Sequence, residues 1–143
     1  SSYQELKQIL EQSKHNNTNL LPDSDVLENL IFISNGSPGT LLENVEIWNQ
    51  IPENIKHEIK YPLKNYENIL FLAKHITSQL NLDYQEFLLS YMQRDWWKKT
   101  KNKRSIEILE DIKNNISSNI QPRISWEVGL LKIKLKESQL SIY

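Results

Sequence analysis

The chain has 143 residues, of which 38% are hydrophobic, enough for one sizeable core or two small ones. Its 17 basic and 18 acidic residues give a formal charge of −1, which provides no global attraction to nucleic acid or an anionic membrane. The absence of cysteine excludes disulfide and thiol chemistry, and the absence of a long apolar run or a signal peptide predicts a cytoplasmic protein.

Glycine and proline are scarce, with three and five residues respectively, too few for the turns of an all-β fold. We therefore expect an all-α protein. The chain starts at Ser1 rather than at a methionine, and we interpret it as a fragment of a longer protein.

Three short helices are expected in residues 1–50. The first begins at the capping box Ser2-Tyr3-Gln4-Glu5. The second is capped by Asp23 or Ser24 and ends at Asn35-Gly36, and the third starts with Ser37 as N-cap and Pro38 in its first turn. Their predicted core residues are Val26, Leu27, Leu30, Ile31, Leu41, Leu42, Val45 and Trp48.

A boundary is expected at Ile51-Pro52, followed by five more helices. They are a short one over 52–60 stopped by Tyr61-Pro62, one over 65–80, one headed by Asp83-Tyr84-Gln85-Glu86, one from residue 106 to 120 and a last one after Pro122. Each of the last four helices has a predicted buried stripe. For the helix over 65–80 it is Ile69, Leu72, Ala73, Ile76 and Leu80, and for the helix headed by Asp83 it is Phe87, Leu88, Tyr91, Met92 and Trp96. For the helix over 106–120 it is Ile106, Leu109, Ile112 or Lys113, Ile116 and Ile120, and for the last helix it is Ile124, Val128, Leu131 and Leu135. Residues 132–136 also alternate as a strand would, although helix is the favoured interpretation.

Motifs for catalysis or cofactor binding are missing from the sequence. It contains no phosphate-binding loop, dinucleotide-binding turn, zinc-protease motif or nucleophile elbow. His15, His57 and His75 lie far apart on different expected elements, so we expect neither a metal site nor a catalytic histidine. Glu107, Glu110 and Asp111 fall opposite an isoleucine stripe, where they are interpreted as a solvated helix face.

A basic run directly follows Trp96-Trp97 and consists of Lys98, Lys99, Lys101, Lys103 and Arg104. Such a run could make weak contacts with a few phosphates. In a protein without net positive charge, a solvated loop between helices is the favoured interpretation. Trp97 is rotated about 100° from Trp96 around the helix, so it is expected to be partly exposed, through ordinary packing or as a docking surface.

One junction resembles a known family. The segment Ile33-Ser34-Asn35-Gly36-Ser37-Pro38-Gly39, between two short helices, resembles the lid domain of AAA+ clamp-loader subunits, most of all the delta-prime subunits of bacterial DNA polymerase III. Residues 121–131 are similar to the last collar helix of that family. The resemblance implies a three-helix AAA+ lid over 1–50 and a helical-bundle collar domain over 51–143, without the nucleotide-binding fold that normally precedes the lid.

The resemblance also implies residue roles. ATP-hydrolysing relatives carry a γ-phosphate-sensing arginine two residues past the serine, and this chain has Gly39 there. Gly36, Ser37, Pro38 and Gly39 are thus expected to form a degenerate nucleotide-proximal junction, in a subunit of the DNA polymerase III holoenzyme without ATP hydrolysis of its own. A subunit interface is implied at Arg123, Trp126, Glu127 and Leu130.

The implied partners are the other clamp-loader subunits of a hetero-oligomeric ring that loads the sliding clamp during DNA replication. DNA would be reached only indirectly, and no cofactor, metal, membrane or small-molecule substrate is implied. Two alternatives stay open. The chain could be the oligomerisation region of another AAA+ ATPase acting in recombination or repair, or a small helical nucleic-acid-binding module that uses Trp97 and residues 98–104.

Overall fold

The computed structural model describes residues 4–5, 8 and 21–142, with side chains described as far as residue 138. The capping box at Ser2 and most of the first expected helix lie outside these residues. The described residues form helices only, with no strand, which confirms the all-α prediction. The helices are α2 (Ser24–Ile33), α3 (Pro38–Gln50), α4 (Glu53–Glu58), α5 (Tyr66–Gln79), α6 (Leu82–Thr100), α7 (Lys103–Ser117) and α8 (Pro122–Ile142).

Internal contacts divide the chain into two compact units, residues 1–52 and 53–143. Within the first unit, α2 packs against α3. The caps of these helices are the predicted ones: Asp23 accepts a hydrogen bond from the Val26 amide at 3.1 Å, and Ser37 accepts one from the Thr40 amide at 3.3 Å. Asn35 has a φ of 51° and directly follows the C-cap Ser34, so it, rather than Gly36, occupies the left-handed backbone position that ends α2; Gly36 follows with a φ of 77°.

The core of the first unit is small. It consists of Leu27, Leu30, Leu41, Val45 and Trp48, all predicted, with Ile51 at the end of α3. Val26, Ile31 and Leu42 lie at its edge and are half-buried. A polar link also joins the two helices, because the Asn44 amide donates to the Ser34 hydroxyl at 3.0 Å and Ser34 donates to the Leu30 carbonyl.

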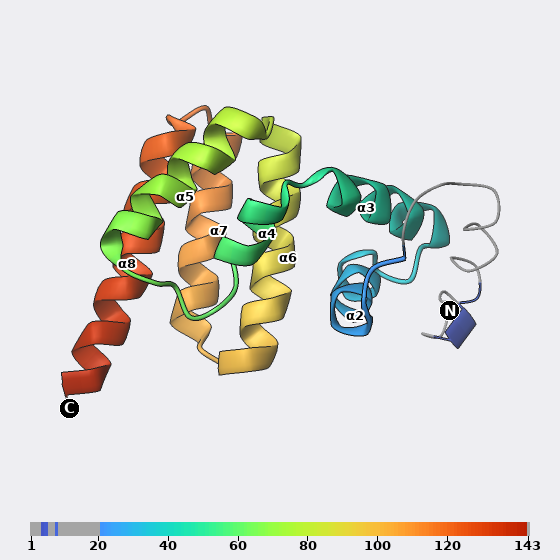
Figure 1. Ribbon diagram of the computed structural model, residues 1–143, viewed down its shortest axis with the longest axis horizontal. Helices are drawn as coiled ribbons and strands as arrows, with labels where there is room; N and C mark the ends of the chain where they lie inside the picture. Colours follow the sequence, from blue (N-terminus) through green and yellow to red (C-terminus); the bar gives the residue numbers. More distant parts are fainter. Residues whose placement is uncertain (1–3, 6–7, 9–20, 143) are drawn as a thin grey trace. The chain divides into compact units, whose positions relative to one another are not determined.

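The second unit is a bundle in which α6, α7 and α8 run alongside one another and α5 packs on α8, as Figure 1 shows. The connection from α6 to α7 is only two residues long, so these helices are antiparallel neighbours. All five predicted core residues of α5 and all five of α6 are buried, which confirms both stripes. Leu89 is buried as well, so α6 is covered on more than one side.

Helix boundaries differ from the prediction in two places. Helix α6 starts two residues earlier than Asp83 suggested, because Asn81 is the N-cap and accepts from the Tyr84 amide at 2.9 Å. The basic run is not a loop. It spans the last turn of α6 and the first turn of α7, with only Lys101 and Asn102 between the helices.

The prediction for α8 was right about helix, including residues 132–136, but wrong about its buried face. The buried residues of α8 are Ser125, Trp126, Gly129, Leu130 and Ile133. The predicted stripe is instead largely exposed, with Ile124 at 51%, Val128 at 45% and Leu135 at 50%, and Leu131 is only half-buried. Ile120, the predicted end of the preceding stripe, lies beyond α7 and is also exposed.

Close approach of two helices explains which face of α8 is buried. A Cβ atom built on Gly129 would overlap the side chain of Ile112 on α7. Glycine is therefore the residue that lets α8 lie this near to α7. The face with Ser125 and Gly129 can come closer to a neighbouring helix than the face with Ile124 and Val128, so the smaller residues turn inward.

Candidate functional site

The junction between α2 and α3 contains Gly36, Ser37, Pro38 and Gly39, the positions expected to lie near a nucleotide. The Ser37 hydroxyl is engaged in capping α3, and none of the four side chains carries a charge. Gly39 is exposed, and a Cβ atom at this position would meet nothing within 4 Å. Lack of space at the Cβ position thus does not explain the glycine. These four residues therefore provide no cationic side chain that could bind a phosphate group.

Two of the four predicted interface residues belong to the core. Trp126 and Leu130 are fully buried inside the second unit, so their side chains are not at its surface and that part of the prediction is corrected. The Trp126 indole nitrogen donates to Gln85 Oε1 at 3.0 Å, and Gln85 Nε2 donates to the Leu80 carbonyl at 2.9 Å. Trp126 therefore links α8 to the buried start of α6.

The other two, Arg123 and Glu127, are accessible. Their side chains lie one helical turn apart on α8, with Arg123 Nε and Glu127 Oε2 at 3.8 Å. They border the exposed apolar stripe of α8, which we define as Ile124, Val128, Leu131 and Leu135. The helical spacing of this stripe was recognised in the sequence but assigned to the core. Trp126, Leu130 and Ile133 form a second apolar face on the same helix. Their spacing was the signal in the sequence that this second face could be the buried one.

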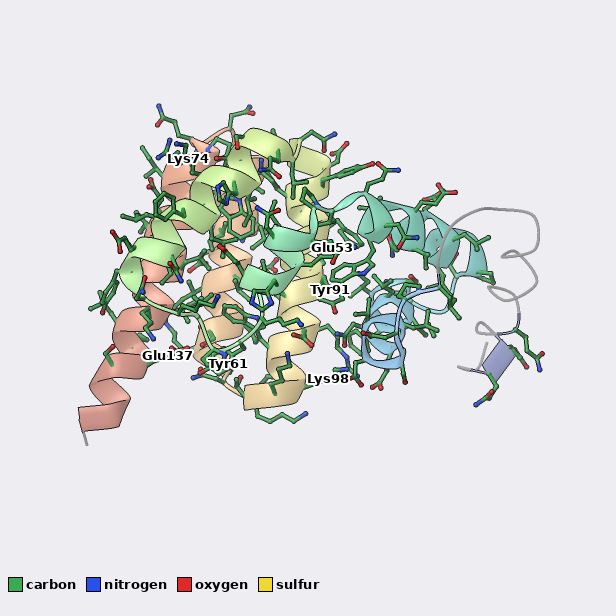
Figure 2. The ribbon with its side chains drawn as sticks, viewed as in Figure 1. Glu53, Tyr61, Lys74, Tyr91, Lys98 and Glu137 are labelled. Atoms are coloured by element: carbon green, nitrogen blue, oxygen red, sulfur yellow. The ribbon has the colours of Figure 1, made fainter. Side chains whose placement is uncertain are left out.

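The basic residues gather at one end of the second unit, where α6 ends and α7 begins. Figure 2 shows Lys98 at this end of α6. Lys99 pairs with Asp95 at 2.8 Å and Arg104 pairs with Glu107 at 3.5 Å, both within their own helices. Lys101 and Lys103 are exposed, and the Lys101 ammonium lies 5.3 Å from the centroid of the Trp97 ring. Trp97 itself is 38% exposed, as predicted.

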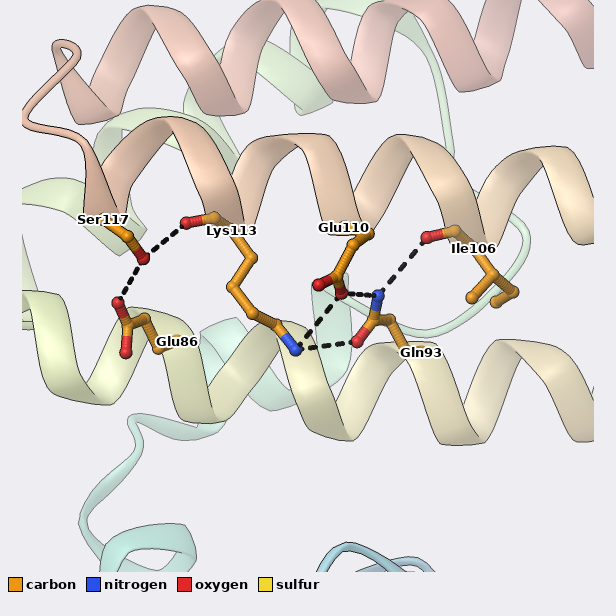
Figure 3. A network of polar contacts seen from close by, with 6 residues as sticks. All are labelled: Glu86, Gln93, Ile106, Glu110, Lys113 and Ser117. Atoms are coloured by element: carbon orange, nitrogen blue, oxygen red, sulfur yellow. Dashed lines mark hydrogen bonds and ion pairs between the residues drawn. The ribbon is translucent and has the colours of Figure 1, made fainter.

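A polar network joins the exposed sides of α6 and α7 (Figure 3). Gln93 Nε2 donates to Glu110 Oε2 at 2.8 Å and to the Ile106 carbonyl, and Lys113 Nζ donates to Gln93 Oε1 at 2.9 Å. The hydrogen bond from Gln93, followed by the charge and hydrogen bond of Lys113, lowers the pKa of Glu110 against the opposing effect of burial. A carboxylate with a lowered pKa is a poor general acid near neutral pH. Glu110 instead takes part in the polar contacts that join α6 and α7.

The surroundings of Tyr61 raise the pKa of its phenol. Burial, and then the hydrogen bond and charge of Glu137, raise its pKa to about 12. Figure 2 shows the two residues at the same end of the second unit. The Tyr61 ring also meets Trp96 edge-on, with 5.4 Å between ring centroids, and the Trp96 indole donates to the Ile59 carbonyl at 3.0 Å. The phenol thus remains protonated and helps to hold the segment after α4 on the bundle.

The part of the chain that the structure describes contains a small cavity between α4 and α5, and it has no cluster of metal-binding side chains. No three His, Cys, Asp or Glu side chains among these residues come together as a metal site. The cavity between α4 and α5, lined by Glu58, Leu63, Lys64, Asn68, Ile69 and Leu72, measures about 10 Å³, which is space for one water molecule at most. None of the helices in the described residues is long and apolar enough to cross a membrane.

Comparison with known proteins identifies the family. The model of the family described as "Cyanobacterial DNA polymerase III delta prime, C-terminal domain" matches residues 4–133 and so covers both units. Searches of curated proteins and of solved structures gave no match. The match extends over most of the chain and ends within α8, so it includes the α2–α3 junction and most of the bundle. The chain therefore belongs to the family of DNA polymerase III delta-prime C-terminal domains.

Proposed function

We propose that the chain is the lid and collar region of a delta-prime-like clamp-loader subunit in the cytoplasm, and that it holds neighbouring subunits in the hetero-oligomeric ring that loads the sliding clamp during DNA replication. The observation that carries the proposal is the family match over residues 4–133. Residues 1–50 take the part of the AAA+ lid and residues 51–143 that of the collar. The chain contributes packing surface and no chemistry.

The surface proposed for a neighbouring subunit is the exposed stripe of α8 with its charged border. Ile124, Val128 and Leu135 present apolar side chains at helical spacing, and a long exposed apolar stripe is uncommon on a surface that faces only water. Arg123 and Glu127 lie beside it and provide the polar rim typical of protein interfaces. The occupant is a helix of an adjacent clamp-loader subunit, whose apolar face would complete a helix-to-helix contact.

The proposed subunit does not read the state of a nucleotide. Sensing a γ-phosphate needs a permanent charge that forms paired hydrogen bonds, which a guanidinium provides and Gly39 does not. The Cβ position of Gly39 is open, so crowding at that atom does not account for the absence of a larger side chain there. DNA and nucleotide would thus concern the assembled complex rather than this junction.

The α8 surface can be tested by co-purification with the other subunits of the same clamp loader. We expect Ile124→Ser with Val128→Ser to weaken capture by about tenfold or more, since each side chain is already about half buried in the free chain and an interface adds only part of the roughly 1.5–3 kcal/mol of full burial. The matched control is Leu70→Ser with Phe71→Ser, which removes a comparable exposed apolar area from α5. Equal losses in both variants, or full capture of the α8 variant, would contradict the assignment of this surface.

An alternative function is the oligomerisation region of another AAA+ ATPase in recombination or repair. It keeps the lid and the bundle but predicts that copies of this chain bind one another. A tetramer of the isolated chain at micromolar concentration would favour it over the clamp-loader proposal.

A further inference from the structure

The end of the second unit where α6 meets α7 concentrates positive charge. We define the α6–α7 corner as Trp97, Lys98, Lys99, Lys101, Lys103 and Arg104. It includes five of the 17 basic residues, of which Lys99 and Arg104 pair with Asp95 and Glu107 one helical turn away, so the local excess of positive charge is smaller than five. Two helix ends and a two-residue connection bring these charges together, instead of spreading them along a loop. Such a density of charge favours a polyanion locally, even though the whole chain is not basic.

Helix stability does not explain the charges on α7. The positive end of a helix dipole is at its N-terminus, where acidic side chains are stabilising and basic ones are unfavourable. The first turn of α7 nevertheless carries Lys103 and Arg104 and no acidic residue. Arg104 is partly compensated by Glu107, whereas Lys103 forms no ion pair with a described residue. A bound anion would remove the conflict between these charges and the dipole.

The backbone at Lys101 gives a second indication. Lys101 has a φ of 51° and ends α6 in the left-handed conformation, a position where glycine or asparagine is usual. The other residues with positive φ in the described part of the chain are Asn35, Asn119 and Gly36, which fit that preference. Lysine is the exception, so its side chain contributes something that the turn itself does not require.

Trp97 provides an aromatic surface among these charges. The other three tryptophans, Trp48, Trp96 and Trp126, are buried, whereas Trp97 is the exposed one. The Lys101 ammonium lies over one face of this indole, 5.3 Å from the ring centroid, so a base would stack on the opposite face or take the place of Lys101. An exposed aromatic ring beside several lysines is the combination with which proteins stack a base and neutralise its phosphates.

We propose that the α6–α7 corner binds single-stranded nucleic acid, with the lysines on phosphates and Trp97 stacked on one base. The partner is a single strand because its bases are open to stacking, whereas the bases of a duplex are already stacked on one another. The proposal does not depend on ring assembly, because every residue of the corner is in one unit of this chain.

Fluorescence anisotropy of the full 143-residue chain with a labelled oligothymidylate of about 20 nucleotides tests the proposal. We expect binding to weaken with salt between about 50 and 200 mM, with a slope of log K against log salt of roughly −2 to −3 for three or four phosphate contacts. Lys101→Glu with Lys103→Glu should lower affinity by about tenfold or more and reduce the slope by roughly 1 to 2. The control Lys132→Glu with Lys136→Glu makes the same charge change on exposed positions of α8 and should have a much smaller effect.

Two further variants separate binding from folding. Lys101→Gly relieves the left-handed backbone, so it should leave the chain at least as stable to urea while affinity falls. Because Trp97 is the exposed tryptophan, base stacking should quench its fluorescence, and Trp97→Phe should abolish most of that quenching. Absence of salt-dependent binding, equal losses in the two charge-reversal variants, or equal affinity for a duplex of the same length without quenching would each overturn the proposal.

Discussion

Individual buried polar side chains contribute to the stability of the second unit. Gln85 is almost completely buried, and its amide both accepts from Trp126 and donates to the Leu80 carbonyl. It thereby connects α8 with the turn before α6. A buried donor that loses its partner costs more than the hydrogen bond itself contributes, because it cannot recover a bond to water.

Gln85→Leu should therefore destabilise the chain by about 1–3 kcal/mol, since it leaves the Trp126 indole nitrogen buried without an acceptor. Urea unfolding measures the change. In a Trp126→Phe background the additional cost of Gln85→Leu should be clearly smaller, because the donor is already gone. The same cost in both backgrounds would show that the hydrogen bond is not the cause.

Tyr61 makes stability depend on alkaline pH. Its pKa rises from 10.0 to about 12 on folding, so the folded state holds the phenolic proton more tightly than the unfolded state does. The contribution of Tyr61 to the free energy of unfolding is then complete below pH 10 and is lost as the pH rises from 10 toward 12.

Tyr61→Phe should flatten this part of the stability curve, because the variant has no phenol to ionise. Unfolding by urea at a series of pH values between 8 and 12 measures the difference between the two proteins. A wild-type decline that is unchanged in the variant would assign the alkaline sensitivity to other groups.

At the scale of elements, the α7–α8 contact depends on one missing side chain. A Cβ atom at Gly129 would overlap Ile112, whereas a Cβ atom at Gly39 meets nothing within 4 Å. Both glycines are in helices, so alanine is the better helix former at each site and only the packing differs.

Gly129→Ala should destabilise the chain by about 1–3 kcal/mol from overpacking, reduced by the gain of about 0.5–1 kcal/mol in helix propensity. Gly39→Ala should be neutral or slightly stabilising. Thermal and urea unfolding of both variants provide the comparison. A stable Gly129→Ala protein would mean that α7 and α8 are not as close as described.

The buried residues of a helix could be predicted from the sequence where the helix has a single apolar face. Helix α5 has one dominant face, and its stripe identified the buried residues correctly, whereas in α2 and α3 the predicted Val26, Ile31 and Leu42 are only half-buried. Helix α8 has two apolar faces, and the choice between them rests on the contact of Gly129 with Ile112, which is distant in sequence. The same limit applied to the candidate interface: the resemblance implied Arg123, Trp126, Glu127 and Leu130 together, and it could not show that Trp126 and Leu130 face inward.

The basic residues illustrate a second limit. Their charge was evident in the sequence, but their setting depended on where two helices end. Asn102 caps α7 by accepting from the Ser105 amide at 3.1 Å, which shortens the expected loop to two residues and brings the charges together. The sequence pattern placed the start of α6 at Asp83 and that of α7 at residue 106, whereas asparagines at residues 81 and 102 cap these helices.

At the scale of the whole molecule, the chain consists of two compact units, and α8 of the second unit carries an exposed apolar stripe. The family match covers residues of both units, so the α2–α3 junction and the α5–α8 bundle both belong to the matched family domain. The stripe on α8 and the basic α6–α7 corner involve different residues of the bundle. One chain could therefore contact a neighbouring subunit and a nucleic acid strand through separate surfaces.

Sedimentation velocity tests the central claim most directly, with the chain alone and mixed with the other subunits of its clamp loader at micromolar concentration. The proposal predicts a monomer when the chain is alone and a discrete, faster-sedimenting hetero-oligomer in the mixture. A chain that sediments identically in the two samples, or that forms a tetramer by itself, would contradict the assignment to clamp-loader assembly.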